Sequence, residues 1–251
     1  MSGPVQAFRE IGRSVPRADV LGKVTGEARY GGDLLGPEAL TAAVVRSEHA
    51  HARVLGIDRS AALAIPGVVA VLGRDEIGGT NRHGLIKRDH PVFCDEVVRY
   101  LGDAIALVVA ESTAAAEAGR KAVRVDYEPL PVLGTMEQAE AAGAPLLHAD
   151  GNVMGQQLIR KGDMARGKAE ADQVVRCRFQ MRGVDHAFLD VEAGCAEMDG
   201  DTVVIYASGQ WIHEERRLVA LALGVPVERV RIVQPATGGA FGGREDISIQ
   251  I

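Results

Sequence analysis

The stretch YASGQWIHEERRLVALALGVPVERVRIVQPATGGAFGGRE, residues 206–245, decides the fold class. Its central part (213–224) has the apolar spacing of an amphipathic helix, which a Gly-Val-Pro sequence then ends. Apolar runs on either side, 202–208 and 229–235, are typical of strands. A strand, a helix and a second strand in this order predict a right-handed unit whose two strands are parallel.

A glycine-rich loop, TGGAFGGRED (237–246), follows the second strand of this unit. Ligands of open α/β sheets bind at that end of a strand, and glycines let backbone N–H groups approach an anionic ligand. The loop is no P-loop, because Arg-Glu follows Gly243 where Lys and Ser/Thr are required. Nor does it match the dinucleotide-binding fingerprint, since Ala240 and Phe241 occupy the glycine positions. Two interpretations stay open: a ligand-binding nest, or a tight turn that packs Phe241 into the core.

Upstream of this unit, short strands alternate with short helices. Strands are predicted at 39–47, 51–58, 68–72, 103–110, 123–128, 171–182 and 192–198, helices at 59–65 and 112–122, and a surface loop at 73–93. The apolar run 103–110 indicates a strand buried on both faces. Asp199-Gly200 predicts a hairpin turn.

The predicted fold class is therefore mixed, α+β or α/β, in more than one region. We expect an N-terminal arm (1–18), a first domain (19–131), a linker (132–152) and a second domain (153–251) that is incomplete. The last residues, REDISIQI (244–251), are interpreted as an element cut short.

Composition excludes several classes of protein. With 47% hydrophobic and 25% charged residues the chain can form a core, and its net charge of −6 gives no basic surface for nucleic acid. It has no apolar run long enough for a membrane span and no signal-peptide pattern, so a cytoplasmic location is expected. Cys94, Cys177 and Cys195 are too far apart in sequence for a metal cluster and are expected to be reduced thiols.

The histidines form no convincing metal site either. His49 and His51 share one strand face by their spacing, but we interpret both as part of the first domain's structure. His186 and His213 are interpreted as packing or surface residues.

Four upstream segments lead to a family resemblance. They are RADVLGKVTGEARYGGD (17–33), VVRSEHAHARVLGIDRSAALAIPGVVAVL (44–72), GDAIALVVAESTAAAEAGRKAVRVDYEPLP (102–131) and DHAFLDVEAG (185–194). In this order, ahead of SGQ (208–210) and the glycine loop, they resemble the molybdopterin-binding subunit of the xanthine dehydrogenase/aldehyde oxidase family. The first three resemble its N-terminal α/β-hammerhead domain, and the fourth the start of its molybdenum-cofactor domain.

The resemblance implies a molybdopterin cofactor, expected as the cytosine dinucleotide, whose molybdenum is reached through hydrogen bonds. The family's glutamine that donates to the molybdenum oxo ligand falls on Gln210. The family's loop that approaches the cofactor falls on Gly238, Gly239, Ala240, Phe241, Gly242 and Gly243. Gln210 and Phe241 would thus lie next to the metal's own ligands. Ala240 and Arg244 depart from the glycine and lysine that are common in the family.

The resemblance also implies a reaction: hydroxylation of an electron-poor carbon with oxygen from water. Glu245 matches a substrate-binding glutamate of purine-oxidising members, so an N-heterocycle such as a purine is expected. An aldehyde is the alternative substrate. Electrons would leave through iron–sulfur clusters and FAD on partner chains or domains of a multi-subunit complex.

No catalytic residue is expected within this chain, because the family's base lies beyond position 251. A C-terminal portion or subunit would supply it, and the chain alone is expected to be inactive. Two other classes remain open: a non-catalytic assembly module, and an unrelated anion-binding α/β module.

Overall fold

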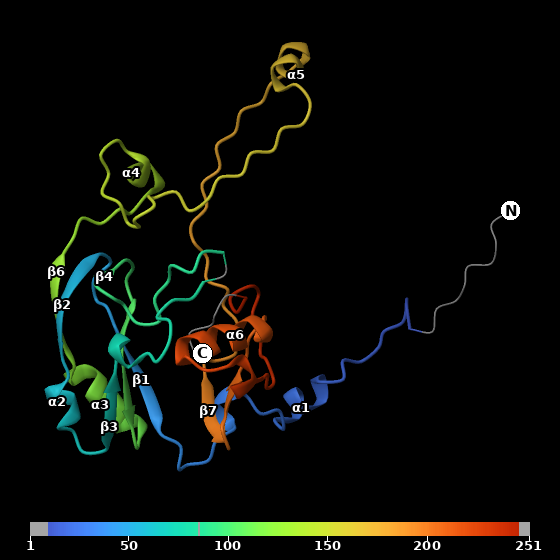
Figure 1. The fold of residues 1–251 in the computed structure, drawn as a ribbon. Coiled ribbons are helices and arrows are strands. Elements are labelled where there is room, and N and C mark those ends of the chain that lie inside the picture. Colours follow the sequence, from blue (N-terminus) through green and yellow to red (C-terminus); the bar gives the residue numbers. More distant parts are fainter. Residues whose placement is uncertain (1–9, 85, 246–251) are drawn as a thin grey trace. The chain divides into compact units, whose positions relative to one another are not determined.

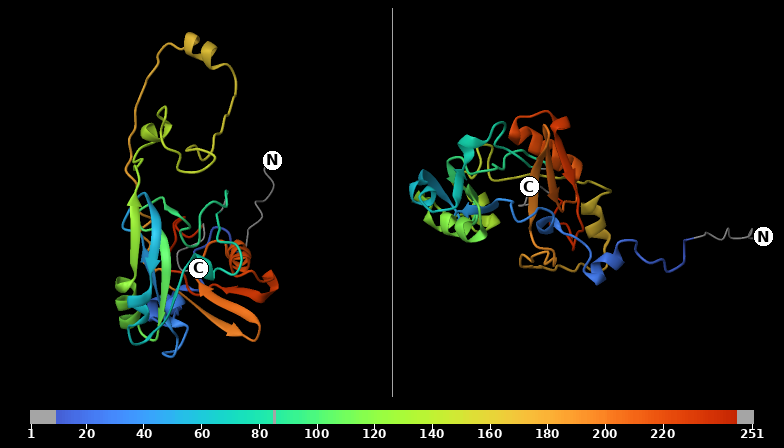
Figure 2. Two further views of the ribbon diagram at one scale, coloured as in Figure 1. Left: turned by 60° about the vertical axis from the view of Figure 1, so that its left-hand side comes forward. Right: turned by 90° about the horizontal axis from the view of Figure 1, so that it is seen from below.

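The computed structural model describes residues 10–84 and 86–245, and it divides into two compact units (Figures 1 and 2). Of the described residues, the first unit contains 10–37, 188–221 and 225–245, and the second contains 38–84, 86–187 and 222–224. Residues 246–251 of the element interpreted from 244–251, and the first half of the predicted arm, lie outside the described residues.

The second unit is built on two three-stranded antiparallel sheets (Figure 1). In one sheet β5 (Ala104–Ala110) lies between β1 (Thr41–Arg46) and β3 (Val68–Leu72). In the other, β2 (Ala52–Asp58) lies between β4 (Val97–Val98) and β6 (Arg124–Pro129). The strands predicted between residues 39 and 128 are all confirmed, and β4 was missed because it is only two residues long.

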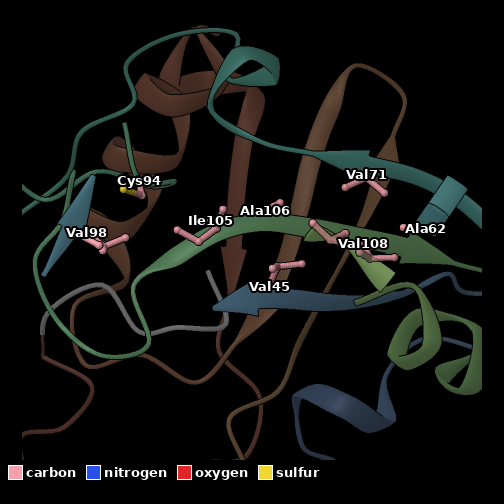
Figure 3. Close-up of a cluster of buried hydrophobic side chains, with 10 residues drawn as sticks. Val45, Ala62, Val71, Cys94, Val98, Ile105, Ala106 and Val108 are labelled. Carbon is pink, nitrogen blue, oxygen red and sulfur yellow. The ribbon is translucent and has the colours of Figure 1, made fainter. Parts of the chain in front are cut away.

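The central position of β5 explains its apolar sequence. Ile105, Ala106, Val108 and Ala110 are all buried, and Figure 3 shows the first three in one cluster with Val45, Val71, Val98 and Cys94. A strand with neighbours on both edges satisfies its backbone hydrogen bonds within the sheet, so it tolerates apolar side chains on both faces. The prediction of a strand buried on both faces is confirmed.

Two helices complete this part of the unit: α2 (Ser60–Leu63) and α3 (Thr113–Ala122). Ser112, where the helix 112–122 was predicted to begin, is the N-cap of α3, since its side chain accepts a hydrogen bond from the N–H of Ala115. The helix packs on β1, β5 and β3. Gly119 permits this close packing, because a Cβ there would lie 2.8 Å from a methyl group of Val108.

Three short elements of this unit were not revealed by the sequence. They are the 3-10 helix η2 (Arg74–Glu76) in the predicted surface loop, and the helices α4 (Met136–Glu140) and α5 (Met164–Glu170). The prediction of a strand at 171–182 is wrong for the structure described, which gives these residues an extended course without sheet partners. The alternation that suggested the strand is real, but a strand also needs a neighbour to satisfy its backbone groups.

The first unit contains the strand–helix–strand element that was predicted from residues 202–235. The hairpin of β7 (Gly194–Asp199) and β8 (Thr202–Ala207) is confirmed, and Gly200 has the positive φ of 57° that its turn requires. Helix α6 (Ile212–Leu223) then leads to β9 (Val230–Val233), which pairs parallel with β8 as predicted.

Three short helices complete the first unit: α1 (Val20–Thr25), η1 (Gly31–Asp33) and η3 (Val227–Arg229). Both units thus mix small sheets with helices, and the predicted mixed fold class is confirmed. Among the described residues, the structure contains no helix that is long and apolar enough to cross a membrane.

Candidate functional site

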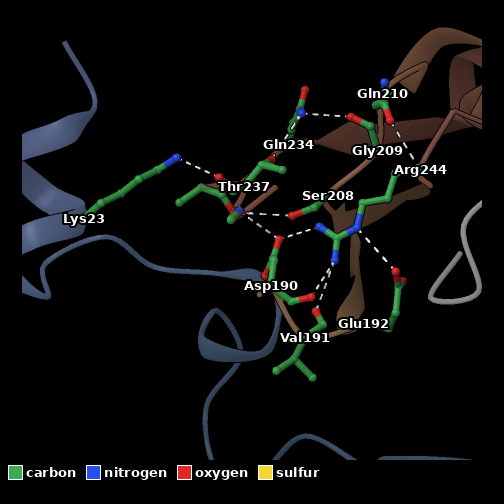
Figure 4. A network of polar contacts seen from close by, with 12 residues as sticks. Lys23, Asp190, Val191, Glu192, Ser208, Gly209, Gln210, Gln234, Thr237 and Arg244 are labelled. Carbon is green, nitrogen blue, oxygen red and sulfur yellow. Dashed lines mark hydrogen bonds and ion pairs between the residues drawn. The ribbon is translucent and has the colours of Figure 1, made fainter. Parts of the chain in front are cut away.

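The glycine loop leaves the end of β9 and is held at its start by side chains from distant parts of the first unit (Figure 4). Lys23 of α1 donates a hydrogen bond to the carbonyl oxygen of Thr237 over 2.6 Å. The N–H of Gly238 donates to Asp190 Oδ2 over 3.1 Å. Gly238 must be a glycine, because a Cβ there would lie 2.9 Å from the Cβ of Asp190.

Arg244 fixes the other end of the loop from within the protein. Its side chain is 0% exposed and forms a buried ion pair with Asp190, and it reaches Glu192 Oε1 at 3.4 Å. It also donates to the carbonyl oxygen of Asp190 over 3.0 Å and lies 4.4 Å from the ring centre of Phe188. Separate nitrogen atoms of the planar guanidinium group make these contacts, and a lysine side chain, with a single nitrogen, cannot reproduce this arrangement. Arginine in place of the family's lysine therefore fits the pocket that this chain provides.

Gln210 is hydrogen-bonded to the main chain of that same arginine (Figure 4). Its backbone N–H donates to the carbonyl oxygen of Arg244 over 2.9 Å, and its Oε1 accepts from the N–H of Arg244 over 3.3 Å. Among the described residues the Nε2 group of Gln210 has no acceptor, so its two protons are available to a ligand. Gln234 steadies the preceding residue by donating to the carbonyl oxygen of Gly209 over 2.8 Å. The structure thus brings the predicted glutamine and the glycine loop together.

Phe241 is displayed at the surface of the loop. It is 75% exposed, which overturns the interpretation of a turn that packs this ring into the core. Its φ of 50° is unusual for a bulky residue and indicates local strain. Within the described part of the chain, the N–H groups of Phe241 and Gly242 have no hydrogen-bond acceptor. They therefore remain available to a ligand.

The other predicted loop residues also have definite conformations. Gly239 has a φ of 116°, which favours glycine. Ala240 lacks a positive φ, so its methyl group replaces the family's glycine without backbone strain. The N–H of Gly243 donates to the carbonyl oxygen of Ala240 over 2.8 Å and closes a turn. Glu245 is exposed directly after Arg244, and Arg244 pairs with Asp190 instead.

Glu215 is a residue of this neighbourhood that the sequence analysis missed. It lies in the first turn of α6, is 1% exposed, and neither carboxylate oxygen has a hydrogen-bond partner among the described residues. Side chains of a helix point toward its N-terminus, and this carboxyl group packs on Gly209, where an added Cβ would lie 2.0 Å from Oε1. Burial raises the pKa of Glu215 to about 7. Its spacing of three residues from the buried Leu218 was the available signal for burial.

The described residues contain no group of three or more His, Cys, Asp and Glu side chains able to hold a metal ion. The three cysteines are free thiols, and burial raises the pKa of Cys94 to about 12. His51 is buried and within 2.5 Å of the carbonyl oxygen of Pro131, and His49 packs on Tyr127 with ring centres 4.7 Å apart. These two histidines have packing contacts, in agreement with their predicted structural role.

Family models match two regions of the chain. Residues 25–131 match the model of the aldehyde oxidase and xanthine dehydrogenase a/b hammerhead domain. Residues 147–251 match the model of the molybdopterin cofactor-binding domain. The chain therefore belongs to the aldehyde oxidase and xanthine dehydrogenase family of molybdenum-dependent oxidoreductases, and its second region is the part that in this family binds the molybdenum cofactor.

Individual relatives agree with this assignment. The chain is 36% identical to the nicotinate dehydrogenase large molybdopterin subunit of Eubacterium barkeri over 97% of its own length and 57% of the relative's. It is 36% identical to a probable xanthine dehydrogenase subunit of Bacillus subtilis, covering 93% of this chain and 32% of that one. The solved aldehyde oxidoreductase of Desulfovibrio gigas matches with a TM-score of 0.86 at 33% identity, over 91% of this chain and 27% of that one. The chain thus spans only part of the proteins that it resembles.

Replacing Arg244 with methionine should strongly destabilise the first unit. The substitution leaves Asp190 as a buried carboxylate without its cation, and breaking a buried pair in this way costs about 3–5 kcal/mol. Denaturant unfolding and limited proteolysis of the glycine loop measure the effect. Arg166→Met is the matched control, since its ion pair with Glu170 is exposed and is expected to contribute less than about 1 kcal/mol. Equal stability of the two variants would contradict the assigned role of Arg244.

Replacing Glu215 with glutamine should make stability less dependent on pH. The folded protein raises the pKa of Glu215 from 4.5 to about 7, so the folded state binds more protons than the unfolded state between these values. The contribution of Glu215 to the stability of the wild type is therefore fully present below pH 4.5 and is lost as the pH rises through about 7, by about 3 kcal/mol for this shift. The variant carries no charge, so its melting temperature should exceed that of the wild type increasingly from pH 5 to pH 8. Parallel melting curves across this range would disprove the raised pKa.

Proposed function

We propose that this chain forms one wall of the active site of a molybdenum hydroxylase that acts on an N-heterocycle such as a purine. The observation that carries the proposal is the fixed carboxamide of Gln210, whose oxygen is occupied by the main chain of Arg244. Its Nε2 group is thereby a preorganised donor beside a loop with free N–H groups in the described structure.

The residues present fit a molybdenum–pterin group that is held without direct side-chain ligands. Such a group needs hydrogen-bond donors for its own oxygen and sulfur atoms, and Gln210, Phe241 and Gly242 offer donors of this kind. The described part of the chain has no competing cluster of ligating side chains. Gln210 and the loop residues Gly238, Gly239, Ala240, Phe241, Gly242 and Gly243 would hold the group, which we expect to be the cytosine dinucleotide form.

When bound, the molybdenum centre supplies oxygen-atom and hydride chemistry that no side chain of this protein can supply. Gln210 would donate a hydrogen bond to an oxygen or sulfur atom of this group and would withdraw electron density from it. The loop keeps its N–H groups in place because Arg244 and Asp190 anchor its two ends. Preorganised donors of this kind need no rearrangement at the moment of reaction.

Glu245 supports a heterocyclic substrate. Its carboxylate is exposed and follows the loop directly, so it can accept a hydrogen bond from a ring N–H. Nicotinate and xanthine, named in two of the relatives, are both nitrogen heterocycles. An aldehyde is the second candidate, and the similarity to an aldehyde oxidoreductase favours it.

The domain boundaries, the rest of the active site and the electron-transfer partners are proposed from the membership of the chain in this family. We propose a hammerhead domain at 19–131, a linker at 132–152 and a first part of the cofactor domain at 153–251, after an N-terminal arm at 1–18. The catalytic base and the rest of the cofactor site would come from a C-terminal portion or subunit. Iron–sulfur and FAD partners would carry electrons away from a cytoplasmic complex.

Replacing Gln210 with leucine in the assembled enzyme tests the proposal. Turnover should fall about 100-fold, because one preorganised donor is lost, while molybdenum and pterin content stays the same. Gln138→Leu, at an exposed position of α4, is the control and should leave both unchanged. An assembly without molybdenum, or one that Gln210→Leu leaves fully active, would favour the non-catalytic module instead.

Replacing Glu245 with glutamine tests the substrate class. With a heterocycle, kcat/KM should fall by about 10- to 100-fold, because a hydrogen bond to a charged group contributes about 1.5–3 kcal/mol. With an aromatic aldehyde it should change by less than about threefold, since that substrate has no ring N–H to donate. Glu228→Gln removes an exposed carboxylate elsewhere in the same unit and serves as control. A larger loss with the aldehyde would reverse the assignment.

A further inference from the structure

The glycine loop begins with one peptide group whose two polar atoms are both bound by charged side chains (Figure 4). The carbonyl oxygen of Thr237 accepts a hydrogen bond from Lys23 Nζ over 2.6 Å. The N–H of Gly238 donates to Asp190 Oδ2 over 3.1 Å. This oxygen and this N–H belong to the same planar peptide unit. A cation therefore holds one side of the unit and an anion holds the other.

Without these contacts the peptide unit could turn easily. A peptide plane turns when ψ of one residue and φ of the next change together, and a glycine in the second place permits a wider range of φ than any other residue. Gly238 has to be a glycine, because an added Cβ would lie 2.9 Å from the Cβ of Asp190. The loop thus begins at a residue of high conformational freedom, and the direction of its first peptide depends on what binds that peptide.

The charges on the two sides favour one direction of the peptide over the reverse. Hydrogen bonds that include a charged group are stronger than neutral ones. Asp190 is buried, and the side chain of Lys23 is only 22% exposed, so water screens these charges less than it screens surface charges. A turned peptide would place its oxygen toward the carboxylate and its N–H toward the ammonium group. Both contacts would then become repulsive.

The segment that carries Lys23 is itself fixed to the first unit at further points. The carbonyl oxygen of Arg29 accepts a hydrogen bond from the N–H of Ala236 over 3.2 Å. The carbonyl oxygen of Gly31 accepts one from Cys195 Sγ of β7 over 3.2 Å. An added Cβ at Gly31 would lie 2.5 Å from the carbonyl oxygen of the residue before β7, so the two backbones are in close contact. The ammonium group of Lys23 therefore extends from a fixed part of the chain.

The residues before the glycine loop are also joined to the residues before Gln210. Ser208 Oγ donates a hydrogen bond to the carbonyl oxygen of Ala236 over 3.3 Å. Gln234 Nε2 donates one to the carbonyl oxygen of Gly209 over 2.8 Å. A change in the direction of the first loop peptide would therefore displace both the N–H groups of the loop and the donor of Gln210.

We propose that Lys23 is a positioning residue of the molybdenum site, which fixes the direction of the Thr237–Gly238 peptide and thereby of the glycine loop. It acts through a main-chain carbonyl group and contacts neither the cofactor nor the substrate. The effect on the peptide is a property of this chain whatever reaction it serves. The effect on turnover rests on the proposed function.

Hydrogen exchange of the loop in the assembled enzyme tests the effect on the peptide. Lys23→Met removes the donor and keeps an unbranched side chain, so amides of 237–243 should exchange at least about tenfold faster, because the loop opens more often. Lys121→Met, the same change at an exposed position of α3, should leave their exchange unchanged. Wild-type exchange in Lys23→Met would overturn the proposal. An assembly without molybdenum contradicts the proposed function, but its loop exchange still tests the role of Lys23.

Turnover tests the consequence for the site, and the effect should appear in kcat rather than in KM. In Lys23→Met kcat should fall by about 10- to 100-fold, because the loop donors are displaced, while KM changes less than about threefold, since no substrate contact is removed. Molybdenum content should stay the same, and the paramagnetic resonance spectrum of the molybdenum should change. Lys23→Arg keeps a cationic donor and should recover most of the wild-type kcat. A loss in KM alone, or a full loss of activity in Lys23→Arg, would refute the positioning role.

Two further variants separate this role from simpler ones. Asp19→Asn removes the other partner of Lys23, an exposed carboxylate at 3.2 Å, and should leave loop exchange and kcat unchanged. The same losses in Asp19→Asn as in Lys23→Met would assign the effect to that ion pair and refute the proposal. Lys23→Gln, with a neutral and shorter donor, is used if Lys23→Met does not fold. It should raise loop exchange by at least about threefold, and wild-type exchange in it would equally overturn the proposal.

Discussion

The buried ion pair between Arg244 and Asp190 is the contact on which the geometry of the site depends. A guanidinium that is 0% exposed is stable only with its charge paired, and Asp190 and Glu192 provide that pairing. Asp190 also accepts the N–H of Gly238, so one carboxylate anchors both ends of the glycine loop. The main chain of Arg244 in turn positions Gln210.

Because both of its ends are anchored, the loop can keep an aromatic ring exposed and backbone N–H groups without acceptors. Phe241 keeps a left-handed backbone conformation and an exposed ring, and the neighbouring N–H groups stay without acceptors in the described structure. Such strain persists only where the surrounding structure over-determines it. A binding site gains from this arrangement, because donors already held in place need no reorganisation when a ligand arrives.

Two parts of the second unit differ in how closely their side chains are packed. Around β5, the strands and α3 close a core from this chain's own side chains. Residues 153–187 are exposed, and their large apolar side chains are not part of a buried cluster of the described residues.

The sequence by itself determined the elements that rest on local contacts: the apolar strand 104–110, the Ser112 cap, the Gly200 turn and the parallel unit around α6. Each of these elements depends on residues close in the chain, whose periodicity or turn-forming residues predict the local structure. The family resemblance located Gln210 and the glycine loop. Only the tertiary structure decided that Arg244 is buried against Asp190, that Glu215 packs on Gly209, and that 171–182 is extended without a ladder. These outcomes depend on contacts with residues that are distant in sequence or outside the described part of the chain. A local sequence pattern does not determine whether a charged side chain is paired or whether a strand has a neighbour.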